Sequence, residues 1–209
     1  MSRTFISALV EPFSDQLNSI LSILDQLVCS QGCVKVLPSK LHATVIYSDV
    51  ELDANVVNIV LDQVNLPFSV NITRAACFDP LPRADGTRDP NLATIVLTIW
   101  SPQLEALHKA CITLGGTHEY EYAPHISLWY DVPRDIAEVA VSKLNSVMLD
   151  YRLDALKQKL KATFVAFHVE AAAQPIIDAP SSPDDLRAEL HLLEKRVRDL
   201  EDLMRPRVC

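Results

Sequence analysis

Runs of apolar residues along the chain predict six β-strands. These runs are rich in Val, Ile, Thr and Phe, the residue types that fit a pleated and half-buried surface. They cover Arg3–Val10, His42–Tyr47, Phe68–Phe78, Leu92–Trp100, His125–Tyr130 and Lys161–Glu170. The segments between them have a different period, so an all-β fold is not expected.

Apolar residues at helical spacing predict four helices between these strands. The first follows Ser14, the expected N-cap, and its apolar face consists of Leu17, Ile20, Leu21, Leu24, Leu27 and Val28. Another begins at Ser101 and ends at Gly115-Gly116, and its inward residues are Leu104, Leu107, Cys111 and Leu114. Shorter helices are expected at 53–64 and 133–149.

The order of these elements repeats itself. Each half of the chain reads strand, helix, strand, helix, strand. We therefore expect an α+β fold of two pseudo-symmetric β-α-β-α-β lobes around a central cleft. The segment "PLPRADGTRDPN" between the halves is rich in Pro, Asp and Arg, and it is expected to be an exposed loop.

A hexapeptide is duplicated together with the element order. "HATVIY", from His42 to Tyr47, matches "HISLWY", from His125 to Tyr130, and both are followed by similar residues. The core of each copy is His, any residue, then Ser or Thr, a pattern that chance alone would give about 0.7 times in this chain. The shared flanks make an internal duplication the better explanation. Each copy opens a strand of its own half, so the two strands are expected to meet in the cleft.

The duplicated residues suit phosphodiester chemistry. On a strand, residues two apart share a face, so His42 lies beside Thr44 and His125 beside Ser127. Two imidazoles can act as base and acid on opposite sides of one phosphorus, and two hydroxyls can donate to its non-bridging oxygens. The nucleophile could be a ribose 2′-hydroxyl or a water that attacks a cyclic phosphate. By the same alternation, Trp129 is expected to line the pocket.

Composition narrows the possible ligands. Nearly half of the 209 residues are hydrophobic, so most of the chain is expected to fold as a globular domain. The net charge of −8 argues against binding along a long nucleic acid, which needs an extended basic surface. With only four glycines there is no Gly-rich loop to hold a phosphate, so side chains or ordinary turns must do so.

The cysteines and apolar stretches indicate the setting. Five cysteines at irregular spacings do not suggest a disulfide framework, and a reducing cytoplasm is expected. The start of the chain lacks the apolar segment of a secretory signal, and no stretch is long enough to span a bilayer. No cluster of Asp, Glu, His or Cys has metal-ligand spacing, so we expect catalysis without a metal or a cofactor.

The other histidines are expected to be structural. A single histidine on a strand or an apolar helix face is more often a partnered structural residue than a catalyst. We apply this interpretation to His108, His118, His168 and His191. His108 lies on the apolar face of its helix, so a partner in the core is expected.

The composition changes near the C-terminus and predicts three parts. Residues 1–170 form the catalytic domain, 171–182 a linker, and 183–209 a helix whose apolar residues alternate spacings of four and three. This spacing is that of a coiled coil and favours a homo-oligomer. The alternative is one amphipathic helix that folds back onto the domain.

The two motifs and the element order resemble the two-histidine phosphoesterase superfamily, over about residues 3–170. "KLHATVIYSDV" and "LEALHKACITLGGTHEYEYAPHISLWYDV" resemble the phage enzymes that defeat CBASS, the bacterial anti-phage system that signals with cyclic oligonucleotides. The resemblance implies an acid and base pair, His42 and His125, with Thr44 and Ser127 as phosphate ligands. It further implies metal-independent hydrolysis of 3′–5′ linkages in cyclic di- and trinucleotides, in the cytoplasm of the infected host.

Base-binding residues follow from the same resemblance. The family places an aromatic residue on its first strand to stack a base, and Phe5 occupies that position. An acidic residue late in the last strand reads a base edge, and Glu170 is the nearest match.

Two other functions stay open at this point. A related enzyme would cleave linear 2′,5′-linked oligonucleotides or RNA ends with a 2′,3′-cyclic phosphate. A non-catalytic protein with this fold would instead sequester cyclic nucleotides, or assemble through its C-terminal helix.

Overall fold

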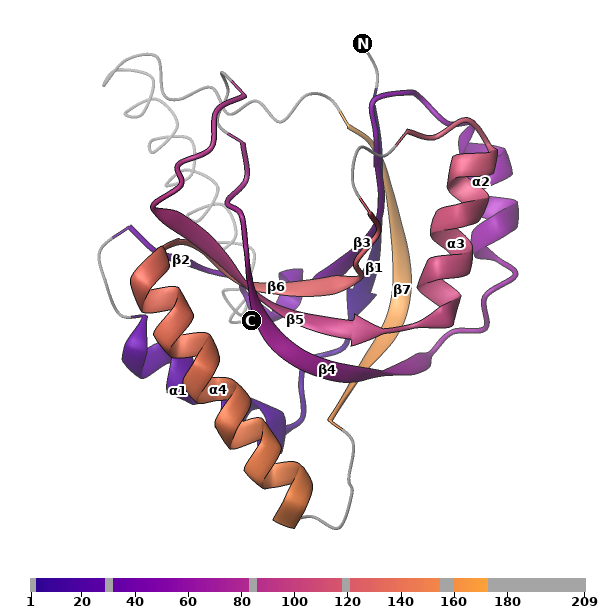
Figure 1. Ribbon diagram of the computed structural model, residues 1–209. Coiled ribbons are helices and arrows are strands. Elements are labelled where there is room, and N and C mark those ends of the chain that lie inside the picture. Colours follow the sequence, from indigo (N-terminus) through magenta and orange to yellow (C-terminus); the bar gives the residue numbers. More distant parts are fainter. Residues whose placement is uncertain (1–2, 29–31, 83–85, 118–120, 155–159, 173–209) are drawn as a thin grey trace, which may run out of the picture.

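The computed structural model describes residues 3–28, 32–82, 86–117, 121–154 and 160–172 (Figure 1). Its last strand reaches Ala172, into the segment expected to be a linker. The remainder of that linker and the predicted helix at 183–209 lie outside the described residues, as do His118 and His191. Among the described helices, none is long and apolar enough to cross a membrane.

All six predicted strands and all four predicted helices are present. In chain order the elements are β1 (Arg3–Val10), α1 (Asp15–Leu27), β2 (Val34–Lys35), the 3-10 helix η1 (Pro38–Lys40), β3 (His42–Ser48), α2 (Ala54–Leu61), β4 (Phe68–Phe78), β5 (Leu92–Trp100), α3 (Pro102–Thr113), β6 (His125–Pro133), α4 (Arg134–Asp154) and β7 (Lys161–Ala172). Two short elements, β2 and η1, were not expected from the sequence.

Local capping explains where two helices begin and end. The Ser14 and Ser101 hydroxyls accept hydrogen bonds from the backbone N–H of Leu17 and Leu104, which satisfies donors that a helix start leaves unpaired. Helix α3 ends before Gly115, whose φ of 97° lies in the left-handed region that favours glycine. Leu114 caps this end and is 37% exposed, so the expectation that it points inward is wrong.

The strands form one antiparallel sheet that closes on itself. The pairing order is β6-β3-β1-β7-β4-β5, and β5 pairs in turn with β6, while β2 adds to β6 (Figure 1). The contact between β3 and β6 is short, with one register pair, Ala43 and Ile126. The ring of strands therefore has an inner face, which it encloses, and an outer face.

The ring is pseudo-symmetric, as the duplicated element order predicts. If β1 is exchanged with β5, β3 with β6 and β7 with β4, the result is the same cyclic order of strands read in the opposite direction. The helices obey the same exchange, because α1 packs on α4 and α2 packs on α3 (Figure 1). The α+β fold of two pseudo-symmetric lobes is therefore confirmed. Each lobe takes its third strand from the other half of the chain, since β7 pairs with β1 and β4 with β5.

The core lies between the outer face and the helices. A row of directly paired residues crosses five strands and is at most 2% exposed: Ala8, Ala43, Ile126, Leu97 and Ala75. The row belongs to the hydrophobic core, and α3 and α4 pack on the strands that carry it, so we infer that the row faces the helices. The Asn145 side chain of α4 also bonds the backbone N–H and carbonyl of Ala75. Residues on either side of the row consequently project to the inner face.

Candidate active site

The Ala43–Ile126 pair brings the two duplicated motifs together. Because β3 and β6 are antiparallel, this register places His42 opposite Ser127 and Thr44 opposite His125. All four side chains flank buried residues of the core row, so they share the inner face, and all four are partly exposed. Two imidazoles and two hydroxyls thus meet at one place that solvent reaches.

Both histidines are held in the same tautomer. The Nδ1 of His42 lies 2.9 Å from the carbonyl oxygen of Lys40, and the Nδ1 of His125 lies 2.8 Å from that of Ala123. A carbonyl oxygen can only accept, so each Nδ1 carries a hydrogen and donates it. In both rings Nε2 is therefore the nitrogen that takes up or releases a proton, as a base and acid pair requires.

Aromatic rings pack against both histidines. The Phe5 ring centroid lies 5.8 Å from that of His42 at an interplanar angle of 90°, and the Phe78 centroid lies 4.7 Å from that of His125 at 60°. Burial lowers the pKa of His125, and the charge of nearby His42 lowers it further, against the opposing effect of the Ala123 carbonyl. Phe78 was not identified from the sequence, because it lies at the end of β4, which is separated from the His125 strand β6 by β5.

A β-bulge lies within each motif, directly after the hydroxyl residue, and changes the face to which the next residues project. The register leaves Val45 without a partner on β1 and Leu128 without a partner on β5. As a result two consecutive residues are buried after each hydroxyl, and the following tyrosines, Tyr47 and Tyr130, are more exposed than these residues. Strict alternation therefore fails beyond Thr44 and Ser127.

Trp129 is consequently not on the face of His125 and Ser127, and this expectation is wrong. It pairs with Ile95, which is fully buried, and it is itself only 9% exposed within the core. The Nζ of Lys35 lies 5.8 Å from its ring centroid and also pairs with Asp25 of α1, a helix that packs against α4. The bulge at Leu128, which a period of two does not reveal, turns the indole away from the inner face.

His108 and Tyr122 form hydrogen bonds to the backbone at the first bulge, from the outer side of the sheet. The Nδ1 of His108 lies 2.8 Å from the carbonyl oxygen of Val45, and the Tyr122 hydroxyl donates to the carbonyl oxygen of Thr44 over 3.0 Å. The two rings are stacked, with centroids 4.0 Å apart and an interplanar angle of 2°. The expectation that His108 has a core partner is confirmed. Tyr122 was not identified from the sequence.

Strand β7 adds polar residues to the inner face beside β1. Glu170 pairs across the strands with Phe5, and His168 pairs with Ser7. The two residues that the family resemblance links to base binding, Phe5 and Glu170, are therefore neighbours. His168 Nε2 lies 2.7 Å from Glu170 Oε1, so this histidine has a partner on its own strand, and its side chain is 51% exposed. The interpretation of His168 as a structural residue stays a prediction.

Residues 14–163, which include both motifs, match the model of the family described as anti-CBASS protein Acb1. The chain belongs to this family. The resemblance inferred from the two motifs is thereby confirmed. The Acb1-family match begins after Phe5 and ends before His168, so it does not cover the inner-face residues of β1 and β7.

An Acb1 relative with the same description comes from Vibrio phage KVP40. It is 33% identical over 95 residues, which are 45% of this chain and 53% of that protein. The chain thus spans about half the length of this curated Acb1 relative.

Two solved structures are similar in overall shape. Kluyveromyces marxianus Usb1 with uridine monophosphate has a TM-score of 0.49 at 9% identity, over 82% of this chain and 95% of that one. The protein TT0787 of Thermus thermophilus has a TM-score of 0.40 at 12% identity, over 80% and 83% of the two chains. Neither likeness bears on the chemistry of the Acb1-family site.

Proposed function

We propose that this protein is an anti-CBASS phosphodiesterase that hydrolyses the 3′–5′ linkages of cyclic di- and trinucleotide signals in the cytoplasm of the infected host. The observation that carries the proposal is the register at Ala43 and Ile126, which puts two histidines and two hydroxyls on one exposed place of the inner face. Membership of the Acb1 family supports the choice of cyclic oligonucleotides as substrates.

In the first step His125 acts as the general base. Its lowered pKa keeps Nε2 unprotonated near neutral pH, so it can accept the proton of the ribose 2′-hydroxyl next to the scissile phosphate. The 2′-oxygen then bonds to phosphorus while the bond from phosphorus to the 5′-oxygen breaks. Protonated His42 donates the Nε2 proton to that leaving oxygen. The products of this step are a 2′,3′-cyclic phosphate and a free 5′-hydroxyl.

In the second step the two histidines exchange roles. His42, now neutral, accepts a proton from a water, whose oxygen attacks the cyclic phosphate. The bond from phosphorus to the 2′-oxygen breaks, and His125 returns the proton to that oxygen. Both side chains end in their starting protonation states, and the linkage has been hydrolysed.

Thr44 and Ser127 stabilise the phosphate through both steps. Each hydroxyl lies opposite the histidine of the other motif, so the two can donate hydrogen bonds to the non-bridging oxygens from opposite sides. Proton transfer and charge stabilisation are then supplied by side chains, and we propose that no metal takes part.

A substrate panel in EDTA tests the proposal. The purified full chain is incubated with cyclic dinucleotides, a cyclic trinucleotide, 2′,5′-oligoadenylate and an RNA end with a 2′,3′-cyclic phosphate, and products are identified by mass spectrometry. We expect the cyclic compounds to be linearised in EDTA. A cyclic dinucleotide that lacks the 2′-hydroxyl at each linkage should bind and remain intact, because it has no nucleophile. Cleavage of the linear compounds alone would contradict the substrate class. Recovery of bound but unchanged cyclic compound would instead indicate a sequestering protein.

A further inference from the structure

A row of directly paired residues leads from His125 to an arginine. His125 on β6 pairs with Thr98 on β5, and Thr98 pairs with Arg74 on β4. Each of the three is adjacent in sequence to a buried residue of the core row, so their side chains project to the inner face. Antiparallel partners have Cα atoms about 4.5–5.5 Å apart, so the Cα of Arg74 lies roughly 10 Å from that of His125. The proposed proton transfers do not use Arg74.

A β-bulge fixes the backbone at Arg74. The register passes from Ile72 directly to Arg74, with Thr73 as the bulged residue, and Thr73 and Arg74 are consecutive exposed residues. The Thr73 hydroxyl donates to the carbonyl oxygen of Thr98 over 3.0 Å. The Thr98 hydroxyl donates to the carbonyl oxygen of Arg74, also over 3.0 Å. These hydrogen bonds hold the strand at the point from which the Arg74 side chain extends.

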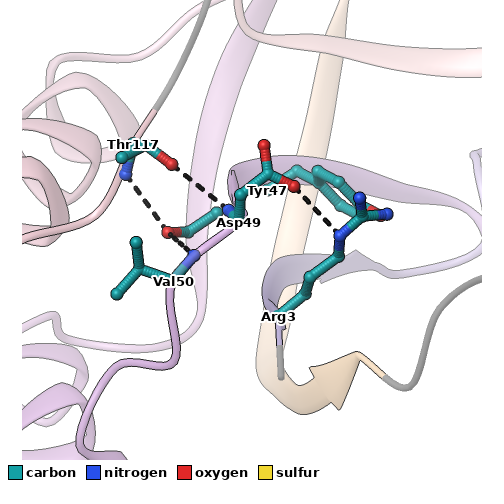
Figure 2. Close-up of polar contacts among 6 residues, drawn as sticks. Arg3, Tyr47, Asp49, Val50 and Thr117 are labelled. Carbon is teal, nitrogen blue, oxygen red and sulfur yellow. Dashed lines mark hydrogen bonds and ion pairs between the residues drawn. The ribbon is translucent and has the colours of Figure 1, made fainter. Parts of the chain in front are cut away.

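The guanidinium of Arg74 has no hydrogen-bond or ion-pair partner among the described residues. Arg3, which lies at the rim of the inner face where β1 begins, differs in this respect (Figure 2). Its Nε is 3.0 Å from Asp49 Oδ1, and its Nη1 donates to the Tyr47 hydroxyl over 3.1 Å. The charge of Arg74 has no such compensation, although the net charge of the chain is −8. An uncompensated guanidinium beside a site for phosphate chemistry indicates an anionic ligand.

The two lobes differ at this position. The strand exchange that relates the lobes turns the row that ends at Arg74 into the row of His42, Leu9 and Ala166. Ala166 carries no charge, so the β4 side of the inner face has a cation and the equivalent place on the β7 side has none. A substrate with a second negative charge would therefore place that charge toward β4.

We propose that Arg74 binds the phosphate of the cyclic substrate that is not being cleaved. The proposal rests on the function proposed above and adds a reason why a ring with two or more phosphates is preferred. The separation of Arg74 from His125 suits two phosphates joined through one ribose. A guanidinium donates two parallel N–H groups to the non-bridging oxygens of such a phosphate. Arg74 moves no proton, so its contribution should appear in KM.

A matched pair of cyclic dinucleotides tests this role. One has two phosphates, and in the other one phosphate is replaced by an uncharged methylphosphonate. Both carry a 2′-deoxyribose at the linkage that differs, so only the remaining phosphate can be cleaved. For the first compound, Arg74→Gln should raise KM about fivefold to tenfold, between the values for an exposed ion pair and a charged hydrogen bond. For the methylphosphonate compound the wild-type KM should already be higher, and the variant should raise it by less than about twofold on the same scale.

The same pair gives the outcome that would overturn the proposal. If Arg74→Gln lowers kcat equally for both compounds, Arg74 contacts the scissile phosphate. If the variant raises KM equally for both, Arg74 contacts a part of the substrate that the two compounds share. Either result rejects a contact with the second phosphate.

Two further variants separate a phosphate contact from other effects of the substitution. Arg74→Lys keeps a positive charge that can bind phosphate, so its KM should lie closer to the wild type than that of Arg74→Gln. Lys35→Gln removes one positive charge from an ion pair with Asp25, away from the inner face, and should leave KM unchanged. The wild-type KM should also rise more steeply with salt than that of Arg74→Gln. Equal salt dependence, or an equal rise in KM for Lys35→Gln, would contradict the proposal.

Binding measurements keep this inference separate from the proposed function. The His42→Ala variant is titrated with the same two compounds, with and without Arg74→Gln. Weaker binding of the two-phosphate compound alone supports the inference even if the wild-type chain cleaves neither compound. If the wild-type chain cleaves both and neither Kd nor KM depends on Arg74, the inference fails and the proposed function stands.

Discussion

The hydroxyl of Tyr122 donates a hydrogen bond of 3.0 Å to the carbonyl oxygen of Thr44. This hydrogen bond connects the segment before the second histidine motif to the backbone of the first motif, directly before the bulge at Val45. Tyr122→Phe removes this hydrogen bond and keeps the ring that stacks on His108. We expect a loss of about 1 kcal/mol in the free energy of unfolding.

The same variant should also slow turnover, because the Thr44 hydroxyl depends on that backbone for its position. If a similar energy is lost only in the transition state, kcat falls roughly fivefold while KM changes little. Chemical denaturation and steady-state kinetics measure the two effects. A loss of stability with a wild-type kcat would show that the hydrogen bond from Tyr122 does not position Thr44.

The two motif histidines should be individually required for turnover. His42→Ala and His125→Ala are each expected to lower kcat by about a hundredfold or more, as for a general acid or base. The double variant should lose much less than the product of the two single effects, because both act on one transition state. Both side chains are partly exposed, so the denaturation midpoint should stay close to that of the wild type. Near wild-type turnover of either single variant would remove that histidine from the mechanism.

The pH dependence should report the lowered pKa of His125. A lowered pKa leaves the base unprotonated at more acidic pH than a free histidine, so kcat/KM should fall only below about pH 6.5. Phe78→Ala exposes the imidazole to water and should move this acidic limb upward. Leu81→Ala, at an exposed residue beyond the same strand, should leave it in place. An acidic limb above pH 6.5 in the wild type would contradict the role of His125 as base.

Gly116 should not tolerate a side chain. A Cβ there would lie 2.7 Å from the carbonyl oxygen of Cys111 and 2.7 Å from Cδ1 of Ile46. Gly116→Ala should therefore destabilise the fold by about 1–3 kcal/mol, the range for overpacking. Gly86→Ala is the matched control, since a Cβ there meets nothing within 4 Å and only its positive φ opposes alanine. Equal midpoints for the two variants in thermal unfolding would show that Cys111 and Ile46 can move aside.

The apolar residues of the predicted C-terminal helix predict that copies of the chain associate. Leu186, Leu190, Leu193, Val197, Leu200 and Met204 have the spacing of about three heptads, which is marginal for an isolated coiled coil. We expect a homo-oligomer that deletion of residues 183–209 weakens, with activity per site preserved. Light scattering of the full-length and shortened chains measures this. An unchanged mass would favour a helix that packs on its own domain.

The strand boundaries could be predicted from the sequence because β-branched runs are bounded clearly. Arg3–Val10, Phe68–Phe78 and Leu92–Trp100 agree with the structure at both ends. The exchange of β4 and β7 between lobes could not be predicted, since it depends on pairing between residues far apart in the chain. The two-residue strand β2 is too short to leave a pattern.

The proximity of the two motifs could also be predicted, because the duplication implied that equivalent strands meet near a pseudo-twofold axis. The error at Trp129 has a physical cause. The bulge at Leu128 is a property of register, which alternation along one strand does not contain. The pairing of His168 with Ser7 on β1 likewise could not be predicted from the segment around His168.

The position of β7 has a consequence for biosynthesis. It is the last described strand of the chain, and it lies between β1 and β4 in the middle of the sheet. At roughly 5–20 residues per second, several seconds pass between synthesis of β4 and of β7. During that time the edges of β1 and β4 have no partner, and such edges can pair with other chains. The nascent chain is therefore more exposed to aggregation on the ribosome than the closed ring is after release.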